Sequence, residues 1–210
     1  KNGMLSVPLW VPDPSGESGA LRLAIIAGKR TPEHTRIVAL TQRPAQVLST
    51  LDATGRPMLF VVQPERVDIF TPTDNLVNPW TRRTLFKAPS DTQVLTLALG
   101  EYPTSATHAG GTAVLIASRW TTGIATEWLS MQGDALQGAA VIPDLGAVVD
   151  LIPRAEDWPA LRFASGTVVV GDQQHTVAGT GQLAPAGSSL IWRTLTQEGP
   201  VSDQPIKLSD

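Results

Sequence analysis

The sequence predicts an all-β protein, and three patterns support this class. Residues 112–117 are apolar or β-branched on both faces of an extended chain and follow Gly110 and Gly111. A strand half open to water alternates, so this unbroken run predicts a central strand covered on both sides. Cleaner alternation flanks it, and turn-forming residues recur at roughly 8–12-residue spacing without long amphipathic helices. We expect an antiparallel β-sandwich or squat β-barrel of about a dozen short strands with long loops.

Local patterns define the expected strands in order. Pro8 cannot donate to a sheet ladder, so the first apolar run is predicted to form an edge strand or extended arm. Asp52 and Gly55 have the composition of a type I turn with a left-handed residue, which predicts a hairpin. A second hairpin is expected around Asp172. The predicted strands are residues 5–11, 20–27, 35–41, 46–51, 58–62, 66–70, 92–99, 112–118, 123–131, 139–142, 147–152, 166–171, 176–179 and 189–195. No segment recurs at a fixed period, so we expect no repeat array.

A single domain is expected. With 210 residues, the chain buries about 70% of its unfolded surface and needs no disulfide or structural metal. We assign residues 1–197 to one β-rich domain and residues 198–210, which contain Pro200 and Pro205, to a solvated polar tail. Cysteine is absent, which excludes disulfides, thiolate catalysis and cysteine-ligated zinc.

Charge and hydropathy argue against two classes of partner. Charged residues make up 17% of the chain, against roughly 25% in an average soluble domain. The net charge is -3 and the isoelectric point is about 5.6, so the chain has no general basic field and we expect no nucleic acid contact. Its apolar runs are far shorter than the roughly 20 residues of a membrane helix, so no membrane insertion is expected.

Catalytic and metal-binding motifs are missing from the sequence. The histidines, His34, His108 and His175, are far apart, and none has a second metal ligand two or four residues away. No Gly-x-Ser-x-Gly elbow and no phosphate-binding loop occurs. Glu127, beside Trp128, is the one acid whose setting favours a raised pKa, although an amphipathic strand would point it to solvent. We expect neither enzymatic activity nor a cofactor.

The longest irregular stretch covers residues 71–88, and its loop over residues 71–83 is predicted to form part of a partner-contacting face. Loops on a rigid scaffold carry recognition, and an exposed tryptophan beside polar and charged residues commonly furnishes sugar and protein sites. The alternative is that the loop tryptophans, Trp80 and Trp158, only anchor their loops. The candidate binding residues are Asp74, Asn75, Asn78, Trp80, Arg82 and Arg83.

The whole profile resembles the protruding or spike domain of the capsid protein of a small non-enveloped RNA virus. Astrovirus-like, nodavirus-like and hepatitis E-like capsids share this character. The chain lacks cysteine, is low in charge and is rich in Thr, Pro, Gly and Val, and residues 166–171 (GTVVVG) and 185–192 (PAGSSLIW) are similar to capsid strands. The resemblance implies a domain that dimerises on the virion surface and mediates attachment to the host cell. It assigns no functional residue.

Two other classes stay open. One is an extracellular bacterial or phage adhesin or carbohydrate-binding module without catalytic activity, and the other is an enzyme on a β scaffold, which the missing motifs disfavour. The expected partners are a host receptor, either protein or glycan, and a second copy of the chain. Low charge, the excess of arginine over lysine and the frequency of two-fold dimers together predict a homodimer.

Overall fold

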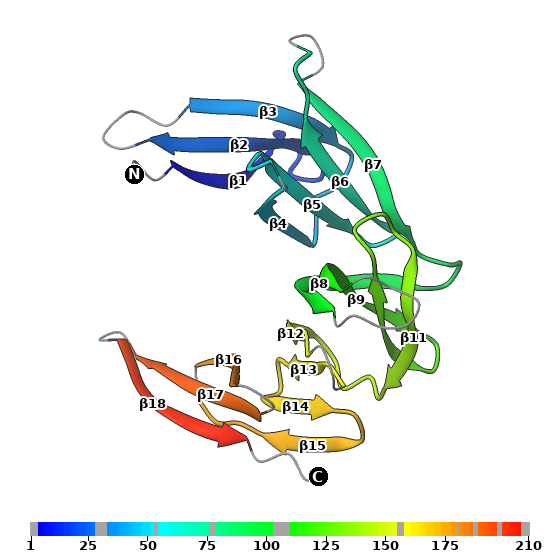
Figure 1. Cartoon of the computed structure of the whole chain (residues 1–210), viewed down its shortest axis with the longest axis vertical. Coiled ribbons are helices and arrows are strands. Elements are labelled where there is room, and N and C mark those ends of the chain that lie inside the picture. Colours follow the sequence, from blue (N-terminus) through cyan, green and yellow to red (C-terminus); the bar gives the residue numbers. More distant parts are fainter. Residues whose placement is uncertain are drawn as a thin grey trace. The chain divides into compact units, whose positions relative to one another are not determined.

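The protein is all-β and antiparallel, as the sequence predicts (Figure 1). The computed structural model describes residues 4–27, 33–52, 54–75, 79–102, 110–154, 158–179, 181–186, 189–196 and 199–206. These residues form eighteen strands and contain no helix. Within this described part, therefore, no helix is long and apolar enough to cross a membrane.

The strands form five sheets, and within each sheet every strand pairs with the next one along the chain. Sheet 1 contains β1 (Met4–Pro12), β2 (Gly19–Ala27) and β3 (Glu33–Leu40). Sheet 2 contains β4 (Gln46–Leu51), β5 (Pro57–Gln63), β6 (Arg66–Pro72) and β7 (Trp80–Lys87). Sheet 3 contains β8 (Gln93–Tyr102), β9 (Gly111–Trp120), β10 (Gly123–Leu129) and β11 (Ala135–Ile142). Sheet 4 contains β12 (Val148–Ile152), β13 (Ala160–Phe163), β14 (Thr167–Val170) and β15 (Gln173–Thr176). Sheet 5 contains β16 (Gly181–Ala186), β17 (Ser189–Thr196) and β18 (Gly199–Ile206).

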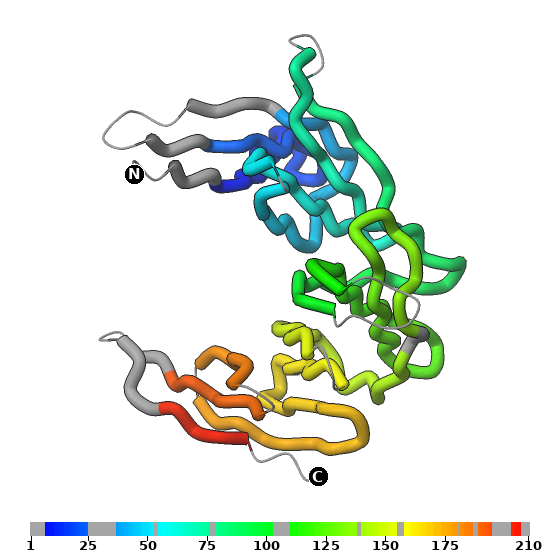
Figure 2. The backbone as a smooth tube through the Cα atoms, viewed as in Figure 1, coloured from blue at the N-terminus to red at the C-terminus, as the bar shows by residue number. Residues whose placement is uncertain are grey.

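Each of the five sheets is therefore an up-and-down meander. The sequence analysis did not predict this recurrence. Figure 2 shows the meander of sheet 4, from β12 to β15, in yellow and gold. The four-stranded sheets begin at residues 46, 93 and 148, so their spacings are 93 − 46 = 47 and 148 − 93 = 55 residues. Because these spacings differ, the structural repeat has no fixed period that a sequence pattern would reveal.

The structure differs from the sequence-based boundaries in several places. No strand was predicted at β13 or β16, and β15 covers Gln173–Thr176 where residues 176–179 were expected. Two further differences concern β7 and β18. Residues 80–87 form β7 where a loop was expected, and residues 199–206 form β18 where a solvated tail was expected. Both strands lie at the edge of their sheet. An edge strand tolerates proline and polar side chains because one side of its backbone needs no partner. The chain also divides into two compact units, Lys1–Pro89 and Ser90–Asp210, rather than one domain over residues 1–197.

The predicted central strand is confirmed. β9 pairs with β8 on one side and with β10 on the other. Residues 113–118 are all buried, whereas Thr112 at the strand start is exposed. Side chains of a strand point alternately to opposite faces, so continuous burial means that both faces of β9 are covered.

The β4–β5 hairpin confirms the turn predicted from Asp52 and Gly55. The Asp52 carboxylate accepts hydrogen bonds from the Thr54 hydroxyl at 2.7 Å and from the backbone N–H of Arg56 at 2.9 Å. These two bonds, in that order, hold the pKa of Asp52 below its ordinary value. Gly55 has φ of 80°, a left-handed conformation that glycine adopts without strain.

Within the first unit, sheets 1 and 2 share one hydrophobic core. Both faces of β5 are buried from Met58 to Gln63, as its unbroken apolar run requires. The residues that join the two sheets are Leu21, Leu23, Leu40, Leu59, Val61 and Phe70.

The second unit has two cores, and sheet 4 contributes to both. Leu161 and Val169 pack into a core with β9 and β10, whereas Ala160 and Val168 pack into a core with β16, β17 and β18. Neighbouring residues of β13 and β14 thus point in opposite directions, as the period of two demands. Trp192 fills the second core, and its Nε1–H donates to the Ala178 carbonyl at 3.0 Å.

Leu115→Ala should lower the free energy of unfolding by about 2–5 kcal/mol, since the side chain is completely buried in the sheet 3–sheet 4 core and its truncation leaves a cavity. Leu51→Ala is the matched control because Leu51 is 63% exposed, and its effect should stay within about 0.5 kcal/mol. Urea titrations of both variants measure the difference. Equal effects of the two substitutions would contradict the assignment of this core.

Candidate functional site

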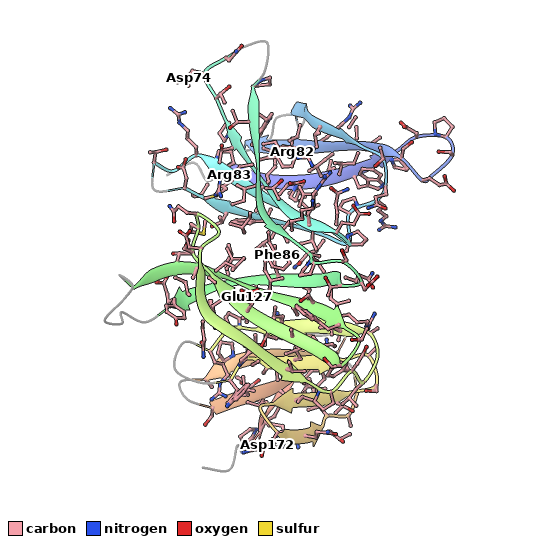
Figure 3. All side chains as sticks on the ribbon, turned by 90° about the vertical axis from the view of Figure 1, so that its right-hand side faces the viewer. Asp74, Arg82, Arg83, Phe86, Glu127 and Asp172 are labelled. Atoms are coloured by element: carbon pink, nitrogen blue, oxygen red, sulfur yellow. The ribbon has the colours of Figure 1, made fainter. Side chains whose placement is uncertain are left out.

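The described candidate binding residues lie on the β6–β7 hairpin, but they do not form one loop surface. Asp74 and Asn75 occupy the connection, whereas Trp80, Arg82 and Arg83 belong to β7 (Figure 3). The Asp74 carboxylate, 92% exposed, lies 3.5 Å from the Arg56 guanidinium. Asn78 lies outside the described residues.

β7 separates the remaining three residues between two faces of sheet 2. Trp80 and Arg82 stand opposite Pro72 and Phe70 of β6, and Arg83 stands opposite Ile69. Because successive side chains alternate, Arg82 shares a face with Trp80 and Arg83 points to the other face. One partner surface therefore cannot contact all of these residues in the way the sequence analysis expected.

Asp68 of β6 is the centre of a charged cluster that the sequence analysis missed. Its side chain is fully buried. Its Oδ2 atom lies 2.7 Å from Nη2 of Arg82 and 3.0 Å from Nε of Arg66, and its Oδ1 atom accepts a 2.8 Å hydrogen bond from the Thr84 hydroxyl. These four residues lie on the same face of β6 and β7, and we call them the arginine face.

The charge balance of the arginine face favours an acidic partner. A buried carboxylate is strongly unfavourable unless it is paired and hydrogen-bonded, and here both oxygens have partners. The guanidinium groups are only partly buried, with 39% of the Arg66 and 37% of the Arg82 side chain exposed. Within the arginine face two guanidinium groups face one carboxylate, and the flanking Glu65 and Lys87 carry opposite charges, so about one positive charge remains.

Neighbouring groups fix both arginines in place. The Arg82 guanidinium lies 6.0 Å from the centre of the Phe70 ring, a distance at which a cation and an aromatic face attract each other. Nε of Arg66 also lies 3.2 Å from Oε1 of the buried Gln63. Beside Arg66 is a polar hollow of about 160 Å³, also lined by Gln63, Glu65, Thr41 and Gln42. Its volume suits a single small polar group rather than a drug-sized ligand, which needs about 300 Å³ or more.

The tryptophans divide into buried, anchoring and exposed types. Trp128 and Trp192 are core residues, at 3% and 1% exposure. Trp80 is partly buried against the core shared by sheets 1 and 2, which matches the anchor interpretation of this residue. Trp120 and Trp158 are 39% and 53% exposed.

The residues considered for chemistry form no metal site within the described part of the chain. Among the described residues, no group of three His, Asp or Glu side chains could hold a metal ion. His108 and the side chain of His34 lie outside the described part. Glu127 is partly buried on β10 opposite Ile116, and burial raises its pKa above the ordinary value. A raised pKa alone assigns no catalytic role.

Comparison with known proteins shows similarity only at the level of fold. No protein-family model and no curated protein matches the chain. The solved structure of BBS1N in complex with ARL6DN matches 95% of this chain and 67% of the other, with a TM-score of 0.51 and 10% identity. At this identity the similarity concerns the fold alone. A prolyl endopeptidase structure covers 96% of this chain and 37% of its own, with a TM-score of 0.31 and 10% identity, which supports no conclusion.

Glu127→Gln should stabilise the protein at neutral pH. Burial raises the folded-state pKa of Glu127 above its ordinary value of 4.5. At a pH between the unfolded-state pKa and the folded-state pKa, the folded state therefore binds more protons than the unfolded state. Stability therefore falls as pH rises through this window. The uncharged glutamine removes that loss, so the melting temperatures of variant and parent should coincide below pH 4.5 and diverge above it. The exposed Glu17 provides the control, since Glu17→Gln removes the same charge from a side chain in water. Parallel pH profiles for Glu127→Gln and the parent would contradict the burial of this carboxyl.

Proposed function

We propose that the protein is a non-catalytic binding module whose arginine face recognises an acidic glycan. The observation that carries the proposal is the buried Asp68 carboxylate, which holds Arg66 and Arg82 with their heads partly in water. Arginine is suited to carboxylate and sulfate groups because its planar fork can donate two hydrogen bonds at once.

Preorganisation is the physical reason to assign binding to this face. A flexible surface arginine loses side-chain entropy when a ligand immobilises it, at a cost of about 0.5–1.5 kcal/mol. Here Asp68, Phe70 and Gln63 already restrict the two guanidinium groups. Most of this side-chain entropy is therefore already lost when the protein folds. Two arginines restricted in this way are better suited to ligand recognition than flexible surface arginines.

The proposal agrees with the roles that the sequence favours. Attachment of a viral spike to a host glycan would use such a face, and so would an adhesin or a carbohydrate-binding module. The virion-surface location and the homodimer remain predictions within the first of these roles.

Arg66→Gln and Arg82→Gln, made singly, should each weaken binding to a heparin-derived octasaccharide by about tenfold, which corresponds to about 1.4 kcal/mol for one lost charge-assisted hydrogen bond. Each single variant leaves Asp68 with the other arginine and Thr84, so the fold should survive. Biolayer interferometry at constant salt measures the affinity, and melting curves check the fold.

Arg193→Gln is the matched control, because it removes the same charge from an exposed ion pair with Asp203 on sheet 5. Its affinity should stay within about twofold of the parent, since Arg193 is not part of the arginine face. An equal loss for all three variants would mean that net charge alone attracts the glycan. No binding by the parent chain would refute the proposal.

A further inference from the structure

Trp158 is held against the turn at one end of sheet 4 while more than half of it stays exposed. The residue lies just before β13 and is 53% exposed. Gly171 begins the β14–β15 turn with φ of 59°. A Cβ atom placed on Gly171 would lie 3.3 Å from both Cγ and Cδ1 of the indole. The ring therefore packs directly on the backbone of the turn, at a place where any side chain on residue 171 would crowd it.

The main chain of Trp158 is fixed as well. Its carbonyl accepts a 3.3 Å hydrogen bond from Nη1 of Arg154, a guanidinium side chain that is itself largely buried at 9% exposure. A tryptophan held in this way offers a large apolar surface with little side-chain entropy left to lose. An anchoring tryptophan is expected to be buried more completely, as Trp80 is by the first core.

The turn also supplies a hydrogen-bond acceptor. Asp172 follows Gly171 and is exposed at the tip of the turn (Figure 3). A carboxylate accepts hydrogen bonds from neighbouring hydroxyl groups, and its negative charge disfavours a ligand that is itself acidic. The surroundings of Trp158 thus suit a ligand that combines an apolar face with uncharged hydroxyl groups.

We propose that Trp158 and Asp172 form a binding site for a neutral pyranose sugar. The C–H face of the sugar ring stacks on the exposed indole, and a sugar hydroxyl donates to the Asp172 carboxylate. This site is separate from the arginine face in both residues and ligand charge, so failure of either proposal leaves the other standing.

The test follows the indole N–H signals of the protein by heteronuclear NMR while cellotetraose or lactose is titrated, with glycerol as a polyol that lacks a ring. Trp158→Phe identifies the Trp158 signal by its disappearance. This signal should shift with at least one of the two sugars and not with glycerol. Trp158→Ala should weaken sugar binding by about tenfold or more, as truncation of a central tryptophan commonly does. Trp158→Phe, which keeps an aromatic face, should lose less.

Trp120→Ala is the matched control, because Trp120 is also exposed, at 39%, yet belongs to sheet 3. Sugar affinity should be unchanged in this variant. The proposal is overturned if neither sugar shifts the Trp158 signal. It is also overturned if Trp158→Ala lowers the melting temperature but leaves sugar binding intact, because Trp158 would then be an anchor only.

Discussion

Each small sheet must bury its apolar face against another sheet, and the rest of this structure depends on that constraint. A sheet of three or four strands is stable only when its apolar faces are shielded from water. β9 is buried on both faces, and sheet 4 sends alternate residues into two different cores. Most exposed polar groups therefore lie on edge strands, strand ends and turns, whereas the buried Asp68 is a paired polar group on the inner strand β6. The arginine face lies along β6 and the edge strand β7. Trp158 packs on the turn between β14 and the edge strand β15.

Strands with strong local patterns could be predicted from the sequence. The run of β9 that is apolar on both faces predicts a buried strand, and Asp52 with Gly55 predicts a turn. Both predictions are confirmed. β7 was missed because residues 81–84 are exposed and polar, and Asp68, the partner of Arg82 and Thr84, lies on another strand. β18 was missed because Pro200 and Pro205 are typical of a linker, yet an edge strand tolerates them. The meander repeat has unequal spacing and was invisible for that reason.

The candidate site could be predicted only in part. The sequence indicated the region around β7, including Arg82, but alternation along the strand places Arg83 on the opposite face. The buried Asp68 could not be recognised, because Arg66-Val67-Asp68 resembles an ordinary amphipathic strand until its partners are known. Trp80 and Trp158 are alike in sequence, since both stand beside a proline in a polar segment. Only burial distinguishes the anchor from the exposed ring.

Amide hydrogen exchange, resolved by residue, tests the central claim that strands covered on both faces stabilise each unit. Amides in β5, β9 and β14 should exchange only through cooperative opening of the unit that contains them, because water reaches neither face of these strands. Amides on the outer side of the edge strands β7, β15 and β18 should exchange by local fraying and be far less protected. Protection of β9 no greater than that of β18 would contradict the account.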